Sequence, residues 1–98
     1  MTRRIQLTRH AVEDYRYREK QDKKILKRIR GLMDSIAQDP FSGIGKPEPL
    51  KDNLAALWSR RIDQKHRLVY EVFHDHIIVH AVRFHLRLSL LAGVFGVV

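Results

Sequence analysis

The pattern of hydrophobic and polar positions divides the chain into a strand, two helices, a loop and three further strands. Residues 3–8 (RRIQLT) alternate between polar and apolar side chains, which predicts a short strand. Thr8 can cap a helix that runs to about Lys20, and Asp22 can cap a second helix that ends near Gln38. The second helix carries an apolar stripe that predicts a buried face, formed by Ile25, Ile29, Leu32, Met33 and Ile36.

The pattern in the second half of the chain predicts a loop followed by strands. Residues 39–54 (DPFSGIGKPEPLKDNL) show no period and are rich in proline and glycine, so they predict a loop. Three segments rich in β-branched and aromatic residues follow, at 57–62 (LWSRRI), 66–73 (HRLVYEVF) and 76–86 (HIIVHAVRFHL). Their short polar links predict an antiparallel meander. The order β-α-α-β-β-β predicts a small α+β domain with two N-terminal helices packed on one face of an antiparallel sheet.

Alternation along the predicted strands assigns each side chain to one face of the sheet. In the segment 66–73, Leu68, Tyr70 and Val72 share the apolar face. In the segment 76–86, the same reasoning groups Ile78, His80, Val82 and Phe84. If the apolar faces meet the helices, the exposed face carries Arg67, Arg83 and His85. Ser59 and Arg61 are expected to join them, although WSRRI is too short for alternation to decide its faces. A register error of one residue would reverse the assignment.

The charge of the chain favours a polyanionic partner. Its 98 residues suit one domain, and 19 Lys and Arg against 11 Asp and Glu give a formal net charge of +8. Such a charge fits nucleic acid, an anionic membrane surface or an acidic protein. Eight of the basic residues fall within residues 16–30, on the predicted helices, where they form either a solvated face or a surface that contacts phosphates.

Cysteine content and the two ends of the chain restrict the class further. The chain has no cysteine, which excludes a disulfide framework and a cysteine nucleophile and fits a reducing cytoplasm. Its start lacks the apolar core of a secretory signal, and the apolar tail 88–98 is shorter than the roughly 20 residues of a membrane-spanning helix. We therefore expect a cytoplasmic protein without a membrane contact.

His74, His76 and His80 flank a predicted turn and are not expected to converge on a metal ion.

The segment GKPEPLK (45–51) places one carboxylate, Glu48, between two prolines inside a basic chain. The prolines predict that Lys46 and Glu48 are held extended, which preorganises the carboxylate for a substrate. Together with the cations and histidine of the exposed face, Glu48 suits cleavage of RNA by attack of its own 2′-OH group. Glu48 is then the candidate base and His85 the candidate acid. The candidate phosphate-binding cations are Lys46, Lys51, Arg61, Arg67 and Arg83.

Each of these residues also has an ordinary structural interpretation. Glu48 can pair with a neighbouring lysine, and His85 can be a strand histidine without a chemical role. Arg67 can pair with Glu71 or with an acid on a neighbouring strand. From spacing alone, therefore, these residues form either an active site or ordinary structural contacts.

The motifs resemble a known family. The stretch KPEPLKDNLAALWSRRIDQKHRLVYEV, followed by AVRFH, is similar to the YoeB/Txe toxins of type II toxin–antitoxin systems, in the RelE superfamily of ribosome-dependent mRNA interferases. The likeness covers most of residues 5–85. It implies a microbial-ribonuclease-like α+β fold and cleavage of mRNA in the ribosomal A site, without a metal or other cofactor. It also implies a YefM/Axe-like antitoxin partner, and dimeric toxin is common in the family.

The resemblance also implies roles for individual residues. The glutamate of KPEPLK, the proposed general base, falls on Glu48. The arginine of HRLVY, which stabilises the phosphate, falls on Arg67. The histidine of the C-terminal motif, the general acid, falls on His85. Lys51 and Arg61 fall on positions that contact RNA or phosphate.

Two departures from the family pattern concern the C-terminal end. Leu86 stands where the family has a tyrosine that contributes to the site, and residues 87–98 extend beyond the domain expected at 1–86. We therefore expect weaker activity than in relatives that end in His-Tyr. A non-catalytic module that binds RNA or the ribosome is the alternative, and a related toxin that inhibits a protein target is a second one. KPEPLK and His85 argue against the second.

Overall fold

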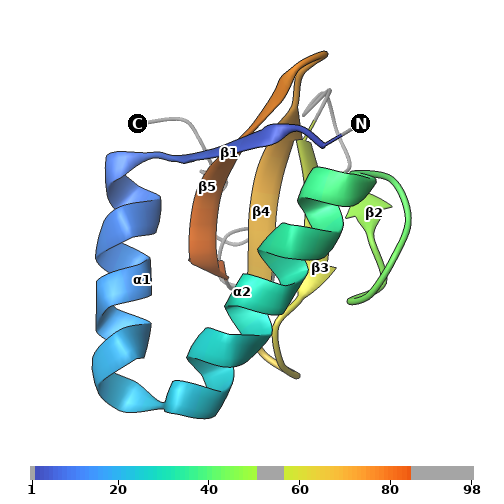
Figure 1. The fold of residues 1–98 in the computed structure, drawn as a ribbon. Coiled ribbons are helices and arrows are strands. Elements are labelled where there is room, and N and C mark those ends of the chain that lie inside the picture. Colours follow the sequence, from blue (N-terminus) through green and yellow to red (C-terminus); the bar gives the residue numbers. More distant parts are fainter. Residues whose placement is uncertain (1, 51–56, 85–98) are drawn as a thin grey trace.

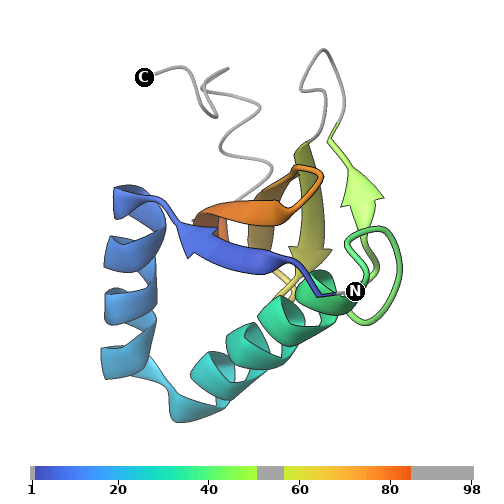
Figure 2. The ribbon, with the colours of Figure 1, turned by 45° about the horizontal axis from the view of Figure 1, so that its top comes forward.

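Two helices lie on one side of a five-stranded sheet (Figures 1 and 2). The computed structural model describes residues 2–50 and 57–84. The helices are α1 (Arg9–Gln21) and α2 (Lys23–Gln38). The strands are β1 (Arg4–Leu7), β2 (Glu48–Pro49), β3 (Leu57–Arg61), β4 (Arg67–Val72) and β5 (His76–Phe84).

Both predicted helix caps are confirmed. The hydroxyl of Thr8 accepts a hydrogen bond from the backbone N–H of Ala11 at 3.1 Å, and the carboxylate of Asp22 accepts one from Lys24 at 2.8 Å. The backbone N–H of Asp22 also donates to the carbonyl of Arg18 at 3.0 Å. One residue therefore ends α1 and begins α2, which gives the sharp corner between the helices (Figure 1). Neither described helix is long and apolar enough to cross a membrane.

The predicted fold class is confirmed, with a sheet that is mixed rather than purely antiparallel. The strand order is β1-β5-β4-β3-β2. Neighbours from β2 to β5 pair antiparallel, as the meander predicts, whereas β1 pairs parallel with β5. A parallel partner requires a long crossover, and the helices and the other strands supply it. The short strand β2 lies inside the segment that was predicted as a loop.

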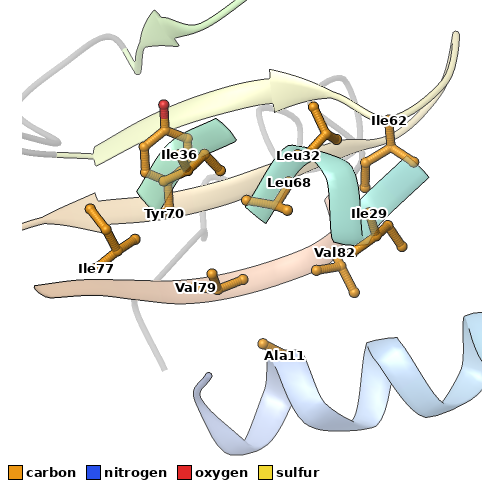
Figure 3. Close-up of a cluster of buried hydrophobic side chains, with 10 residues drawn as sticks. All are labelled: Ala11, Ile29, Leu32, Ile36, Ile62, Leu68, Tyr70, Ile77, Val79 and Val82. Carbon is orange, nitrogen blue, oxygen red and sulfur yellow. The ribbon is translucent and has the colours of Figure 1, made fainter. Parts of the chain in front are cut away.

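The apolar stripe of α2 forms one side of the core (Figure 3). Ile29, Leu32 and Ile36 are fully buried, as predicted, and Ile25 and Met33 pack against them from the margin. The sheet and Ile62, directly after β3, supply the other side; the strand residues are Leu68, Tyr70, Ile77, Val79 and Val82.

A bulge in β5 changes the predicted faces of that strand. Tyr70 pairs with Val79 and Val69 pairs with Ala81, so His80 is the extra residue of the bulge. Ile77 and Val79 therefore face the core together with Val82, and the grouping of His80 with Val82 is wrong. The imidazole of His80 instead contacts the carboxylate of Glu71 at 2.9 Å.

Truncation of the central α2 residue provides a measure of this core. We expect Leu32→Ala to lower the free energy of unfolding by about 2–5 kcal/mol, because Leu32 is fully buried between α2 and the sheet. Chemical denaturation followed by circular dichroism measures the loss. The exposed Lys27 lies on the same helix, and Lys27→Ala should change stability by less than about 0.5 kcal/mol. Equal effects of the two changes would contradict the assignment of the buried face.

Candidate functional site

An ion pair joins two of the predicted site residues on the sheet face away from the helices. The carboxylate of Glu48 lies 2.7 Å from Nη1 of Arg67. The same Nη1 donates a hydrogen bond to the hydroxyl of Ser59 at 3.2 Å. Glu48 is the register partner of Ser59, so strand pairing itself brings the carboxylate to this position. We call Glu48, Ser59 and Arg67 the Glu48 cluster.

Three neighbouring strands build the cluster. Arg67 stands on β4, Ser59 on β3 and Glu48 on β2, so the arginine side chain crosses the middle strand to reach the carboxylate. Ser59 is fully buried and small, which leaves room for that crossing. A bulkier residue at this position would stand between the two charges.

The two charged groups differ in exposure. The side chain of Glu48 is 52% exposed, whereas that of Arg67 is 14% exposed. The carboxylate is therefore accessible to a proton donor from solution, and the guanidinium is held in a fixed orientation beside it. A carboxylate that can take a proton next to a guanidinium that can hold an anion suits proton transfer coupled to phosphate chemistry.

Two further predicted cations lie close along the chain. Arg61 is the register partner of Arg67 and its side chain is exposed. The backbone N–H of Arg61 donates to the carbonyl of Gly45 at 2.7 Å, which ties β3 to the segment just before Lys46. Lys46 is also exposed, two residues before Glu48.

The prediction that Lys46 is extended is wrong. Lys46 has φ of +51°, in the left-handed region, and it follows Gly45 with φ of +84°. A residue before proline is kept away from the right-handed helical region, and the left-handed turn also satisfies that restriction. Glu48 lies in β2, so for this residue the extended prediction is confirmed.

The remaining predicted site residues are placed elsewhere or not described. Arg83, predicted on the exposed face beside Arg67, instead contacts a helix: its guanidinium lies 3.6 Å from the ring centroid of Tyr17, on α1. Lys51, His85 and Leu86 lie outside the described residues. Their roles stay predictions.

Histidines outside the Glu48 cluster pair with separate acids. His76 contacts Asp75 at 2.7 Å, and His80 contacts Glu71 at 2.9 Å. Within residues 2–50 and 57–84, no group of three or more histidine or acidic side chains is arranged to hold a metal ion. The described part of the chain therefore offers no metal centre beside the Glu48 cluster.

Sequence reasoning missed Arg60, which lies between the two exposed-face residues Ser59 and Arg61. Its side chain is fully buried on the helix side of the sheet. Strand alternation was the signal that could have found it, because two adjacent arginines in a strand must point to opposite faces. The segment LWSRRI is too short for alternation alone to decide its faces.

The fold defines the class of protein. Two helices on a mixed five-stranded sheet are the architecture of the YoeB and RelE-like toxins. The structure aligns with that of a YoeB dimer from Staphylococcus aureus, with a TM-score of 0.80, 43% identity and coverage of 87% of this chain and 99% of that one. A YoeB–YefM complex from the same species aligns with a TM-score of 0.76 and 42% identity, over 87% of this chain and 99% of that one.

Sequence comparison identifies the family. Residues 7–86 match the YoeB-like toxins of bacterial type II toxin–antitoxin systems. A toxin YoeB from Streptomyces coelicolor is 50% identical over 82 residues, which are 84% of this chain and 98% of the relative. The chain belongs to the YoeB-like toxin family, and the resemblance seen in its motifs is confirmed.

Proposed function

We propose that this toxin is a ribosome-dependent endoribonuclease that cuts mRNA in the A site. The observation that carries the proposal is the 2.7 Å contact between Glu48 and Arg67 on the open side of the sheet. It places a proton acceptor and a phosphate-binding group side by side, and the net charge of +8 favours a nucleic acid substrate.

The proposed reaction needs only side chains of the chain and the RNA itself. Glu48 takes the proton of a 2′-OH group, and the resulting oxygen attacks the adjacent phosphorus. The bond from phosphorus to the 5′ oxygen breaks, and His85 gives that oxygen a proton. The products are a 2′,3′-cyclic phosphate and a 5′-OH end. Arg67 stabilises the charge on the phosphoryl oxygens in the transition state.

Substrate binding would rearrange the ion pair. In the free protein Glu48 and Arg67 balance each other's charge at 2.7 Å. An incoming phosphate competes for Arg67, because a guanidinium donates to phosphate with two parallel hydrogen bonds. Glu48 is then left to accept the proton. Lys46, Lys51 and Arg61 add positive charge around the path of the RNA.

The partners we propose follow from the same family membership. Solved relatives include a YoeB–YefM complex and a YoeB dimer. We propose that this chain likewise binds a YefM-like antitoxin, forms a homodimer and acts in the cytoplasm. The basic surface of residues 16–30, where Lys23, Lys24, Lys27 and Arg30 are exposed, would contact ribosomal RNA. The toxin domain would span residues 1–86 and the extension 87–98.

Cleavage of mRNA on programmed ribosomes is the experiment for this proposal. We expect the intact chain to produce cuts in the A-site codon, with 5′-OH ends that primer extension maps. His85→Ala should lower the rate about 100-fold or more, since general acid catalysis contributes about 10²- to 10⁴-fold. His74→Ala is the matched control, because His74 is exposed in the link between β4 and β5. A chain that makes no cuts, with or without ribosomes, contradicts the endoribonuclease.

Leu86 supports one alternative, a toxin whose site is weakened or reduced to binding. Leucine offers neither a hydroxyl group nor an aromatic face for stacking on a base. We expect a chain that carries Leu86→Tyr and stops there to cleave faster than the full chain. A chain that stops at the native Leu86 separates the effect of the tyrosine from that of residues 87–98. If the tyrosine brings no gain, Leu86 does not limit the reaction.

A further inference from the structure

A buried cation lies directly beneath the Glu48 cluster. Arg60 stands between Ser59 and Arg61 on β3 and is fully buried. A charged group in the core is costly unless its hydrogen-bonding capacity is met. The hydrogen-bond acceptors around Arg60 therefore show which segments of the chain its guanidinium joins.

All five N–H groups of this guanidinium find acceptors. Three acceptors are backbone carbonyls of the loop before Glu48, those of Asp39, Ser42 and Ile44, at 2.7, 2.9 and 3.1 Å. The other two are the hydroxyl groups of Ser35 at 2.7 Å and Tyr70 at 3.1 Å. One side chain thus joins α2, the loop, β3 and β4.

The loop is shaped to fit closely around Arg60. Gly43 has φ of +123°, and a Cβ atom there would lie 2.9 Å from Nη1 of Arg60 and 2.4 Å from Oγ of Ser35. A side chain at this position would be strained by the backbone conformation and would overlap Arg60 and Ser35. We call Arg60 and its hydrogen-bond acceptors the clamp. The Tyr70 hydroxyl also donates to the carbonyl of Pro40 at 2.6 Å, which adds a second link to the loop. Burial raises the pKa of Tyr70, so this donor keeps its proton.

Asp39 holds the same loop from its exposed side. Its carboxylate accepts hydrogen bonds from the backbone N–H of Phe41 at 2.9 Å and from the hydroxyl of Ser42 at 2.7 Å. The Phe41 bond is the main reason that the pKa of Asp39 is lowered, and the nearby Arg60 charge lowers it further. Arg60 therefore donates hydrogen bonds to a loop whose conformation is also fixed by Asp39.

Few residues separate the loop that Arg60 holds from Glu48. The carbonyl of Ile44 is held by Arg60, and the carbonyl of Gly45 is held by the backbone of Arg61. Only Lys46 and a proline separate Gly45 from Glu48, and the proline fixes one of the intervening dihedral angles. The position of the loop, together with the pairing of β2 with β3, therefore sets where Glu48 meets Arg67.

We propose that Arg60 is a positioning residue for Glu48, acting through loop 39–45 without touching substrate. The effect on catalysis rests on the proposed function. The effect of Arg60 on the position of β2 can be measured without any cleavage. Lysine cannot replace Arg60, because an ammonium has three donors and no planar arrangement to match the five acceptors.

Amide hydrogen exchange measures the placement of β2 without any cleavage assay. The relevant amides are those of Leu50, which donates to Leu57 at 2.9 Å, and Arg61, which donates to Gly45. In Arg60→Lys we expect both to exchange at least tenfold faster, while the amide of Thr8, which donates to Val79 on the far side of the sheet, is unchanged. Unchanged exchange at Leu50 and Arg61 would overturn the inference, whether or not the protein cleaves RNA.

Single-turnover cleavage measures the catalytic consequence. We expect Arg60→Lys to lower the rate at saturating ribosome concentration about 10- to 100-fold, with the half-saturating concentration unchanged, because a displacement of about 1 Å can cost that much. Arg3→Lys is the matched control, since the Arg3 guanidinium also donates to a backbone carbonyl, that of Phe73 at 3.0 Å, near β1. A normal rate in Arg60→Lys beside an active parent would overturn the positioning role.

Two milder variants keep the inference falsifiable if Arg60→Lys does not fold. Ser35→Ala removes one acceptor of the clamp, and Tyr70→Phe removes another together with the link to Pro40. Both should change exchange at Leu50 and Arg61 in the same direction as Arg60→Lys, by smaller factors. If both leave the exchange unchanged, Arg60 does not position β2.

Discussion

Glu48→Gln is expected to lower the rate of A-site mRNA cleavage by about 100- to 10,000-fold, the range for a general base. Glutamine has the shape of glutamate and keeps an oxygen that can accept from Arg67, but it cannot take a proton from a 2′-OH group. Single-turnover cleavage at saturating ribosome concentration measures the loss. The change should leave ribosome binding intact, because it removes a negative charge from a basic surface.

Two comparisons make this result specific to the chemistry. Glu48 is 52% exposed, so Glu48→Gln should change the free energy of unfolding by less than about 0.5 kcal/mol. Glu13→Gln makes the same chemical change at an exposed position on α1 and should cleave normally. A rate for Glu48→Gln within a few-fold of the parent would exclude Glu48 as the base.

Arg67→Lys is the second change with a large expected effect. It keeps the positive charge but replaces the planar guanidinium with a single ammonium, which cannot form two parallel hydrogen bonds to phosphate. We expect a loss of about 100-fold in the single-turnover rate, similar to removal of one donor from a transition-state site. The ribosome concentration that gives half the maximal rate should change little.

Ser59 allows the geometric part of the Arg67 effect to be measured. Ser59→Ala removes the hydroxyl that accepts from Nη1 of Arg67 at 3.2 Å while the ion pair with Glu48 stays possible. We expect a loss smaller than that of Arg67→Lys, because only the orientation of the guanidinium is loosened. If lysine supports cleavage as well as arginine, then charge alone is sufficient and the fixed guanidinium of the structure has no catalytic role.

The parts of the fold that were predictable from sequence depend on short-range rules. Helix α2 was predicted because its cap and its apolar stripe are both encoded within a few turns. The parallel pairing of β1 with β5 was not, because Ile5 and Ile77 are 72 residues apart and no local pattern links them. The bulge at His80 was missed for a related reason, since an extra residue in one strand is visible only against its partner.

The Glu48 cluster was predictable in its members and only partly in its geometry. The flanking prolines and the family motifs selected Glu48, strand alternation and the family motifs selected Arg67, and the structure brings the two residues together. The ion pair itself was not foreseen, because the register of β2 against β3 lies within a segment that reads as a loop. Arg60 was not predicted because LWSRRI is too short for alternation alone to assign its faces, and the burial of Arg60 in the structure distinguishes it from the exposed Arg61.

The two prolines around Glu48 also determine how the edge of the sheet can be used. The N–H of Leu50 points toward β3, so by alternation the nitrogen of Pro49, and that of Pro47 before it, faces outward. Neither nitrogen carries a hydrogen, so a strand from another molecule would find two missing donors along this edge. The carboxylate thus lies at an edge of the sheet that disfavours pairing with a strand of another molecule.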